Sequence, residues 1–448
     1  MMKYILVFIC VFTVIIAQAQ NPLHITIQNT TLAATDSVLP FWFAANRQGK
    51  IQASNSFLNV TDLYLGQVYK PKTKTGLATT WGGNFVAAFG ETNYMQVNQA
   101  FAGLSLKGWE IKGGLFYDEI RYAGLSTSNG IIGRSQNPRP HPTIRLSTMG
   151  YKPVPFLQNW LSFKGEYDEG LLNDDRYVEG AHLHHKSLYL KIEPASTWDI
   201  NLGLEHFVMW GGTSPIDTIG ELPGWDHYFR YVLALPGNED FIIYDQDNIS
   251  GNQLGSYQLE VVKEFAKMKL TFYLSHPWED NSGLNLHNWQ DNILGLYLHL
   301  KKEKNWITDV LCEFTNIQQG RDSYFNHYMY RSGFTYRQQM LGSPLFYPVI
   351  ISNGISMGIQ SDRFFAHHLG VNGNLSEYVK WKGLLTYIQH LGTYSATYEP
   401  VQNQFSGLFE VQYINPGFPV EIGMAAGIDA GNTISNNFGI QFMVAKRW

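Results

Sequence analysis

The last eleven residues of the chain alternate strictly between the two faces of an extended strand. Phe438, Ile440, Phe442, Val444 and Trp448 share one face, and the opposite face carries small or polar residues with one methionine. A long strand that is apolar on one side only suits a wall between lipid and a watery lumen. An aromatic residue at the carboxyl end fits the aromatic girdle at a membrane interface. The pattern predicts the closing strand of an outer-membrane β-barrel.

The same period of two recurs from about residue 57 to the end. It is clearest in residues 77–89, 198–208, 268–275, 294–301, 405–413 and 420–429. Many of these runs reach about ten residues, whereas strands of a soluble β-sandwich or propeller have about five or six. We therefore predict a transmembrane antiparallel β-barrel. At about 23 residues per strand and connector it has roughly 18 strands, with 16 also acceptable.

Composition agrees with a barrel. Charged residues make up 15% of the chain, aromatic residues another 15%, and there are 42 glycines, whereas soluble domains carry about 25% charged residues. The mean hydropathy is nevertheless −0.18, because lumen-facing polar residues balance lipid-facing apolar ones. The net charge of −5 argues against a nucleic-acid partner.

The amino-terminal residues have the pattern of an export signal. Lys3 is followed by an apolar run over residues 4–16 and by Ala17-Gln18-Ala19, so we expect cleavage after Ala19. The mature chain then contains a single cysteine, Cys312, which excludes an intrachain disulfide and a cysteine-rich metal site.

We divide the chain into a signal peptide (1–19), a small periplasmic or plug element (20–55) and a barrel (56–448). The barrel connectors are uneven: residues 415–417 form a tight turn, whereas residues 212–255 are long and irregular. Short periplasmic turns and long external loops are usual for such barrels.

Residues 133–142 form the most unusual block of the sequence. Pro138, Pro140 and Pro142 exclude a central strand, so a rigid loop should present Arg134, Arg139 and His141 in fixed directions. Composition favours a stiffened turn with solvated charges. The functional alternative is contact with an anion or sugar, because arginine forks match carboxylates.

A second block places Glu205, His206 and Trp210 just before a Gly-Gly bend. A ring beside a carboxylate and an imidazole resembles a sugar-binding platform, with a stacking face and hydroxyl partners. A tryptophan of the interfacial girdle at a strand end explains the pattern equally well.

Other chemistry is less favoured. His182, His184 and His185 lack the accompanying ligand spacing of a metal site. Ser356 lies in a Gly-x-Ser-x-Gly match without the following helix that a nucleophile elbow needs, so we interpret it as a strand or turn residue. Glu166 and Asp168 share a strand face, which could serve glycoside chemistry, but ion pairing across the lumen is the better interpretation.

Three segments in this order, residues 39–47, 137–142 and 205–212, resemble the Wzi family of capsule assembly proteins. The likeness covers nearly the whole mature chain, and the end of the signal resembles those of Bacteroidetes. The resemblance implies an 18-stranded outer-membrane barrel with a small N-terminal helical element, no catalysis and no cofactor.

The implied function is lectin-like attachment of capsular polysaccharide at the surface of a Gram-negative cell. Arg134, Arg139, His141, Glu205, His206 and Trp210 are the candidate polysaccharide-binding residues. The expected partners are a capsular or exopolysaccharide and outer-membrane lipid, with the protein acting as a monomer. A passive porin is the first alternative, and an outer-membrane lipid hydrolase is the second.

Overall fold

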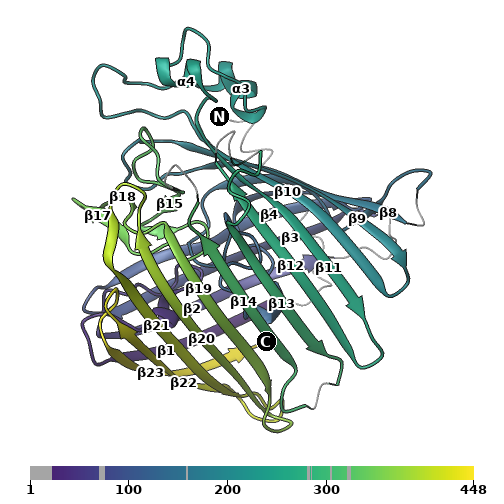
Figure 1. Cartoon of the computed structure of the whole chain (residues 1–448). Helices are drawn as coiled ribbons and strands as arrows, with labels where there is room; N and C mark the ends of the chain where they lie inside the picture. Colours follow the sequence, from purple (N-terminus) through teal and green to yellow (C-terminus); the bar gives the residue numbers. More distant parts are fainter. Residues whose placement is uncertain are drawn as a thin grey trace, which may run out of the picture.

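The computed structural model describes residues 23–69, 76–157, 160–279, 283, 285–302, 305–319 and 324–448. Its main feature is one antiparallel sheet that closes on itself. Strand β1 (His24–Ala34) pairs with β2 (Phe57–Tyr69) on one side and with β23 (Asn437–Arg447) on the other. The result is the predicted 18-stranded β-barrel (Figure 1). The predicted signal peptide lies outside the described residues.

The wall strands follow one another in chain order. After β1 and β2 come β3 (Ala78–Gly90), β4 (Tyr94–Leu106), β5 (Trp109–Leu115), β6 (Thr143–Thr148), β7 (Lys152–Pro153), β8 (Leu161–Leu171), β9 (His182–Ala195), β10 (Trp198–Trp210), β11 (Asn252–Glu264), β12 (Met268–Trp278), β13 (Asn292–Leu300), β14 (Asp309–Ile317), β19 (Arg363–Asn374), β20 (Val379–Gly392), β21 (Thr397–Tyr413), β22 (Glu421–Gly431) and β23. The short β7 continues β6, because both pair with β8. The two together make one wall strand.

The remaining elements are short and lie in connections. They are the hairpins β15 (Thr335–Tyr336) with β16 (Gln339–Met340) and β17 (Val349–Ser352) with β18 (Ile355–Ile359), the helices α2 (Phe41–Ala44), α3 (Tyr228–Val232) and α4 (Ile243–Asp247), and the 3₁₀ turns η1 (Tyr122–Gly124) and η2 (Trp225–His227). None of the helices in the described part of the chain is long and apolar enough to cross a membrane.

Side-chain burial follows the alternation of the sequence. In β23, Phe438, Ile440 and Phe442 are 48%, 56% and 45% exposed, whereas the alternate residues Gln441 and Met443 are buried. The exposed apolar face is the one that contacts lipid, and the buried face lines the lumen. The predicted closing strand is confirmed.

The two ends of the barrel differ in their connectors. At the end of the barrel where β1 begins and β23 terminates, β4 and β5 are joined by residues 107–108 and β9 and β10 by residues 196–197. At the opposite end, residues 116–142, 211–251 and 318–362 form long connections. We call these the termini end and the loop end. Because barrels of this class keep short turns on the periplasmic side, the loop end faces outward.

The structure differs from the predicted boundary at residue 55. Residues 24–34 form β1 and belong to the wall, not to an element that precedes it. The lipid-facing side of β1 and β2 carries polar residues where apolar ones are usual: Asn29 donates to Asn59 (2.9 Å) and Thr61 (3.0 Å) across the two strands. This polar ladder hides the apolar alternation on which the prediction depended.

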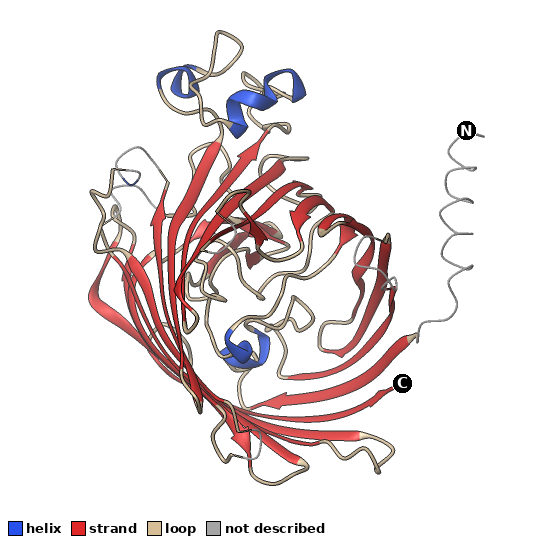
Figure 2. Cartoon of the chain, turned by 90° about the vertical axis from the view of Figure 1, so that its right-hand side faces the viewer, coloured by secondary structure: helices blue, strands red, loops and turns tan. Residues whose placement is uncertain are grey.

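Residues 35–56 enter the lumen from the loop end. Figure 2 shows a short helix inside the ring of strands, where α2 packs against β21 and β22. The Trp42 indole donates to Thr386 (3.1 Å), and the Phe41 amide donates to Asp429 (2.8 Å). Gly439 permits this approach, because a Cβ atom there would lie 2.8 Å from the Pro40 ring. The segment acts as a plug.

A charge on the lipid face of β23 should destabilise the barrel. We expect Phe442→Lys to lower the free energy of unfolding by about 2–4 kcal/mol or more, because the ammonium group must enter hydrocarbon. Urea titration in phospholipid vesicles measures this change. In the control Gln412→Lys, the new side chain enters a lumen cavity of about 1020 Å³ beside Glu410. Equal losses for the two variants would contradict the assignment of the faces.

Candidate functional site

The connection of residues 116–142 folds into the lumen and is held there by ion pairs. Arg134 donates from Nε to Asp118 (2.5 Å) within the same connection and from Nη1 to Glu166 of β8 (2.8 Å). Arg145 of β6 forms a bidentate pair with Asp168 of β8 (both bonds 2.8 Å) and a third bond to Asp118 (2.8 Å). The network fastens the inserted connection to the wall.

These ion pairs set the charge state of Asp118. Burial raises the pKa of its carboxyl group, but the guanidinium groups of Arg134 and Arg145 outweigh burial and hold that pKa well below its usual range. Asp118 therefore stays ionised, and breaking either arginine contact would leave a buried charge uncompensated. The predicted residue Arg134 thus has a structural role in this site.

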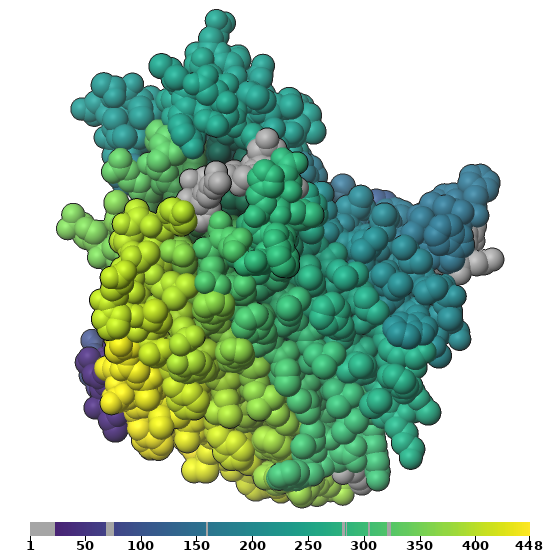
Figure 3. All heavy atoms as spheres, viewed as in Figure 1, coloured from purple at the N-terminus to yellow at the C-terminus, as the bar shows by residue number. Residues whose placement is uncertain are grey.

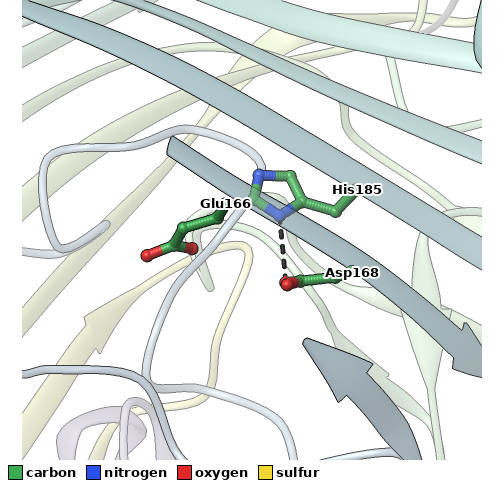
Figure 4. Close-up of side chains that lie close together, drawn as sticks. All are labelled: Glu166, Asp168 and His185. Carbon is green, nitrogen blue, oxygen red and sulfur yellow. Dashed lines mark hydrogen bonds and ion pairs between the residues drawn. The ribbon is translucent and has the colours of Figure 1, made fainter. Parts of the chain in front are cut away.

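Glu166, Asp168 and His185 lie close together in the lumen (Figure 4). They are the one group among the described residues with the spacing of metal ligands. Each is already engaged: Glu166 by Arg134, Asp168 by Arg145, and His185 by Asp168 (3.1 Å) and Glu205 (2.5 Å). The arginines supply the positive charge that a cation would bring. The predicted ion pairing of Glu166 and Asp168 is confirmed, but the partners do not lie across the lumen: Arg145 is opposite Asp168 on the neighbouring strand, and Arg134 belongs to the inserted connection.

Arg139 differs from Arg134 because it forms no ion pair with a described carboxylate. Its Nη2 atom donates to the Val97 carbonyl (3.0 Å), and its buried Nε atom has no partner among the described residues. Burial and repulsion by the nearby Arg337 lower the pKa of Arg139. The guanidinium of Arg337 lies over the Tyr336 ring (5.5 Å to the centroid). Two cationic groups and a ring thus meet in one place.

His141 completes this group from the same proline-rich block. Its ring contacts Tyr336 edge-on, with ring centroids 5.7 Å apart, and packs against the backbone of Gly170. Burial lowers the pKa of His141 to about 4, so the ring is neutral at pH 7. The structure therefore brings Arg139 and His141 together with Tyr336 and Arg337, which the sequence did not single out. Arg337 and Gln338 turn the hairpin β15–β16 with φ of 49° and 64°, and such a short hairpin has no alternation to reveal it.

The predicted platform of Glu205, His206 and Trp210 does not form. Successive residues of β10 point to opposite faces, so Glu205 faces the lumen, where Tyr189 and His185 contact it. His206 and Trp210 face outward. His206 hydrogen-bonds Gln253 (2.6 Å) and stacks on Trp278. The three residues therefore do not form the predicted shared site, because Glu205 lies on the opposite face of β10 from His206 and Trp210.

Trp210 is also fully buried and cannot offer its ring to a sugar. Its indole nitrogen donates to Glu169 (3.1 Å), and its ring stacks on His182 (centroids 4.4 Å apart). Residues of the connection 211–251 cover it from outside, with Tyr231 at 5.4 Å between ring centroids. Trp210 therefore supports this connection and is not a girdle tryptophan.

The lumen is filled at the loop end. Leu39, Leu125 and Phe346, from the three inserted connections, belong to one buried apolar cluster that also contains Ile388 of the wall. Toward the termini end a cavity of about 1020 Å³ remains, lined by charged residues such as Asp309, Lys382 and Glu410. This asymmetry resembles a plugged barrel more than an open channel.

The neutral, buried His141 should make stability depend on pH. Its folded-state pKa lies below its ordinary value of 6.5, so the unfolded chain binds more protons between pH 6.5 and 4 and stability falls as the pH drops through this window. Between pH 7.5 and 4, we expect the free energy of unfolding of His141→Gln to fall by about 2–3 kcal/mol less than that of the parent protein. Urea titrations at both pH values test this, with His24→Gln at the start of β1 as control. An equal fall in the free energy of unfolding between the two pH values for the parent and for His141→Gln would contradict this prediction.

Comparison with known proteins identifies a family for this chain. The family model described as capsule assembly protein Wzi matches residues 27–366. A search of curated proteins found no significant match.

Among solved structures, the chain is similar to Wzi of Escherichia coli, with a TM-score of 0.60 and 13% sequence identity over 97% of this chain and 86% of that chain. That protein is described as an outer membrane protein involved in group 1 capsule assembly and as a carbohydrate-binding β-barrel. The chain is also similar to OpdQ of Pseudomonas aeruginosa (TM-score 0.52, 9% identity, 96% and 99% covered) and to OccK5 (OpdH) of the same species (0.50, 9%, 95% and 97%). These likenesses show the outer-membrane barrel fold. Because the family model covers well over half of the sequence, the family indicated by the three motifs is confirmed, and this chain belongs to the Wzi family of capsule assembly proteins.

Proposed function

We propose that the protein is a non-enzymatic, lectin-like outer-membrane protein that attaches capsular polysaccharide to the cell surface. The observation that carries this proposal is membership of the Wzi family over residues 27–366. The barrel fold alone does not decide the function, because OpdQ and OccK5 share this fold. The carbohydrate binding described for E. coli Wzi supports the same function here.

The group of Arg139, Arg337, Tyr336 and His141 is our candidate for contact with the polymer. Guanidinium forks bind carboxylates in a bidentate manner, and an aromatic ring packs against the apolar face of a sugar. The Arg337 amide donates to Asp174 (2.7 Å), but neither guanidinium group forms an ion pair with a carboxylate among the described residues. An acidic sugar therefore gains two cations without displacing an existing ion pair. Weak contacts of this kind along a polymer add up through multivalency.

Removal of the two positive charges should release capsule. We expect the double variant Arg139→Gln, Arg337→Gln to bind purified acidic capsular polysaccharide about ten-fold or more weakly, since each charge-assisted contact contributes at least about 1.4 kcal/mol. A pull-down with the refolded barrel measures binding, and the ratio of free to cell-associated polysaccharide measures attachment.

The matched control is Arg447→Gln, which removes an exposed arginine at the termini end that pairs with Glu421. It should bind like the parent protein. Unchanged binding and attachment in the double variant, with normal heat-modifiable mobility, would rule out this group of residues. A parent protein that binds no capsular polysaccharide at all would rule out the proposed function itself.

The porin alternative makes an opposite prediction for electrical conductance. Because three inserted connections pack into one apolar cluster at the loop end, we expect the refolded barrel to give no stable open-channel current in planar bilayers. Steady conductance of the parent protein without polysaccharide binding would favour a porin.

The lipid hydrolase alternative has little support from the geometry. Ser356 lies in β18 of a strand–turn–strand hairpin, which agrees with its interpretation as a strand or turn residue. Its hydroxyl is buried and has no hydrogen-bond partner among the described residues, whereas a nucleophilic serine needs an adjacent base. We further propose that the mature protein begins after Ala19 and acts as a monomer in outer-membrane lipid, without a cofactor and without binding nucleic acid.

A further inference from the structure

The connection of residues 211–251 forms a lobe outside the barrel. Figure 2 shows its short helices beyond the ring of strands, and Figure 3 shows the lobe as a protrusion at the loop end. It contains η2, α3 and α4. Val208, Trp210, Tyr231 and Phe241 make a buried apolar cluster of their own, separate from the cluster inside the barrel. The lobe therefore packs on the outer face of the wall.

Polar contacts fasten α3 to that outer face. The Tyr228 hydroxyl donates to Glu169 of β8 (2.8 Å) and lies 2.7 Å from the hydroxyl of Tyr167. Lys186 of β9 donates to the carbonyl of Val232, the last residue of α3. Glu169, Tyr167 and Lys186 all belong to the outward faces of their strands. The position of α3 against the wall is thus defined at both of its ends.

The helix α3 is apolar on two sides. Tyr228 and Tyr231 contact the wall, whereas Phe229 and Leu233, the residue that follows α3, are 72% and 59% exposed. The latter two are four residues apart and share the side that faces away from the wall. When an apolar side of a helix is not covered by other parts of the protein, it requires another apolar environment.

The lipid-facing belt of the barrel begins directly below α3. Leu188 follows Lys186 by two residues on the outward face of β9, about 7 Å along the strand, and its side chain is 51% exposed. Leu204 of β10 pairs with Leu188 and is exposed on the same face. The exposed side of α3 is therefore continuous with an apolar surface that is already in contact with lipid.

We propose that this turn of the lobe is a lipid anchor, in which Phe229 and Leu233 enter the boundary between headgroups and acyl chains of the outer leaflet. Trp225, four residues before Phe229, packs edge-on against Trp210 (centroids 4.8 Å apart) and remains exposed. Tryptophan is the residue that prefers this interface. The exposed side of α3 continues into the lipid-facing leucines Leu188 and Leu204, and the aliphatic Leu233 offers a sugar neither a hydrogen bond nor a ring, so lipid is the partner that the surface favours.

Spin labelling tests the proposed anchor by measuring how deeply each labelled residue lies in the membrane. In a Cys312→Ser background, single cysteines replace Phe229, Leu233, Leu188 or Ser395, and each labelled protein is refolded into vesicles that contain lipopolysaccharide. Accessibility to oxygen and to a water-soluble nickel chelate is then measured. Leu188→Cys is the lipid-facing reference. Ser395→Cys, at the exposed tip between β20 and β21, is the water-facing reference.

We expect labels at 229 and 233 to report a depth of about 5–10 Å below the headgroup surface, with nickel accessibility close to that at 188. Nickel accessibility at 229 and 233 equal to that at 395 would overturn the proposal. It would also be overturned if these positions became shielded only after addition of capsular polysaccharide, because the surface would then bind the polymer. The result does not depend on Arg139 or Arg337, so the lipid anchor and the proposed function can fail separately.

Discussion

Hydrocarbon cannot accept or donate hydrogen bonds, and this constraint determines the rest of the structure. A sheet in a bilayer must have no open edge. Here the edge is removed by the pairing of β1 with β23, which runs from Thr26 opposite Arg447 to Ala34 opposite Gly439. The plug follows β1 and packs against β21 and β22 next to this seam, so its position depends on the closure, whereas the external lobe is held by β8, β9 and β10.

Closure gives every strand two chemically different faces, and the period of two divides neighbouring residues between them. On β10, Glu205 joins an ion-pair network in the lumen, whereas His206 and Trp210 join an aromatic layer beneath the external lobe. On β8, Asp168 binds Arg145 inside, while Glu169 receives hydrogen bonds from Tyr228 and Trp210 outside. Residues that are adjacent in sequence therefore serve separate sites.

Sequence reasoning succeeded where one physical rule acts locally. The alternation in β23 predicted both the strand and its lipid face, because burial of apolar side chains decides each position there. It failed for β1, where the polar residues Asn29 and Thr31 face outward. Both form hydrogen bonds with Asn59 on the neighbouring strand. It also missed Arg337, whose place beside Arg139 depends on how two connections far apart in sequence fold into one lumen. Contacts of that kind leave no local pattern.

The proline-rich block contains two arginines with different roles: one guanidinium group forms ion pairs that fix the segment to the wall, and the other has no carboxylate partner. Arg134 is committed to Asp118 and Glu166, and these bonds fix the segment to the wall. Five residues later, Arg139 has no such carboxylate among the described residues, and the intervening Pro138 limits how far it can move toward one. The ion pairs at Arg134 thus offset the cost of holding a second guanidinium group beside Arg337 without a counterion. An anionic ligand would remove that cost, which is the physical reason for our proposal that an acidic polymer binds at this position.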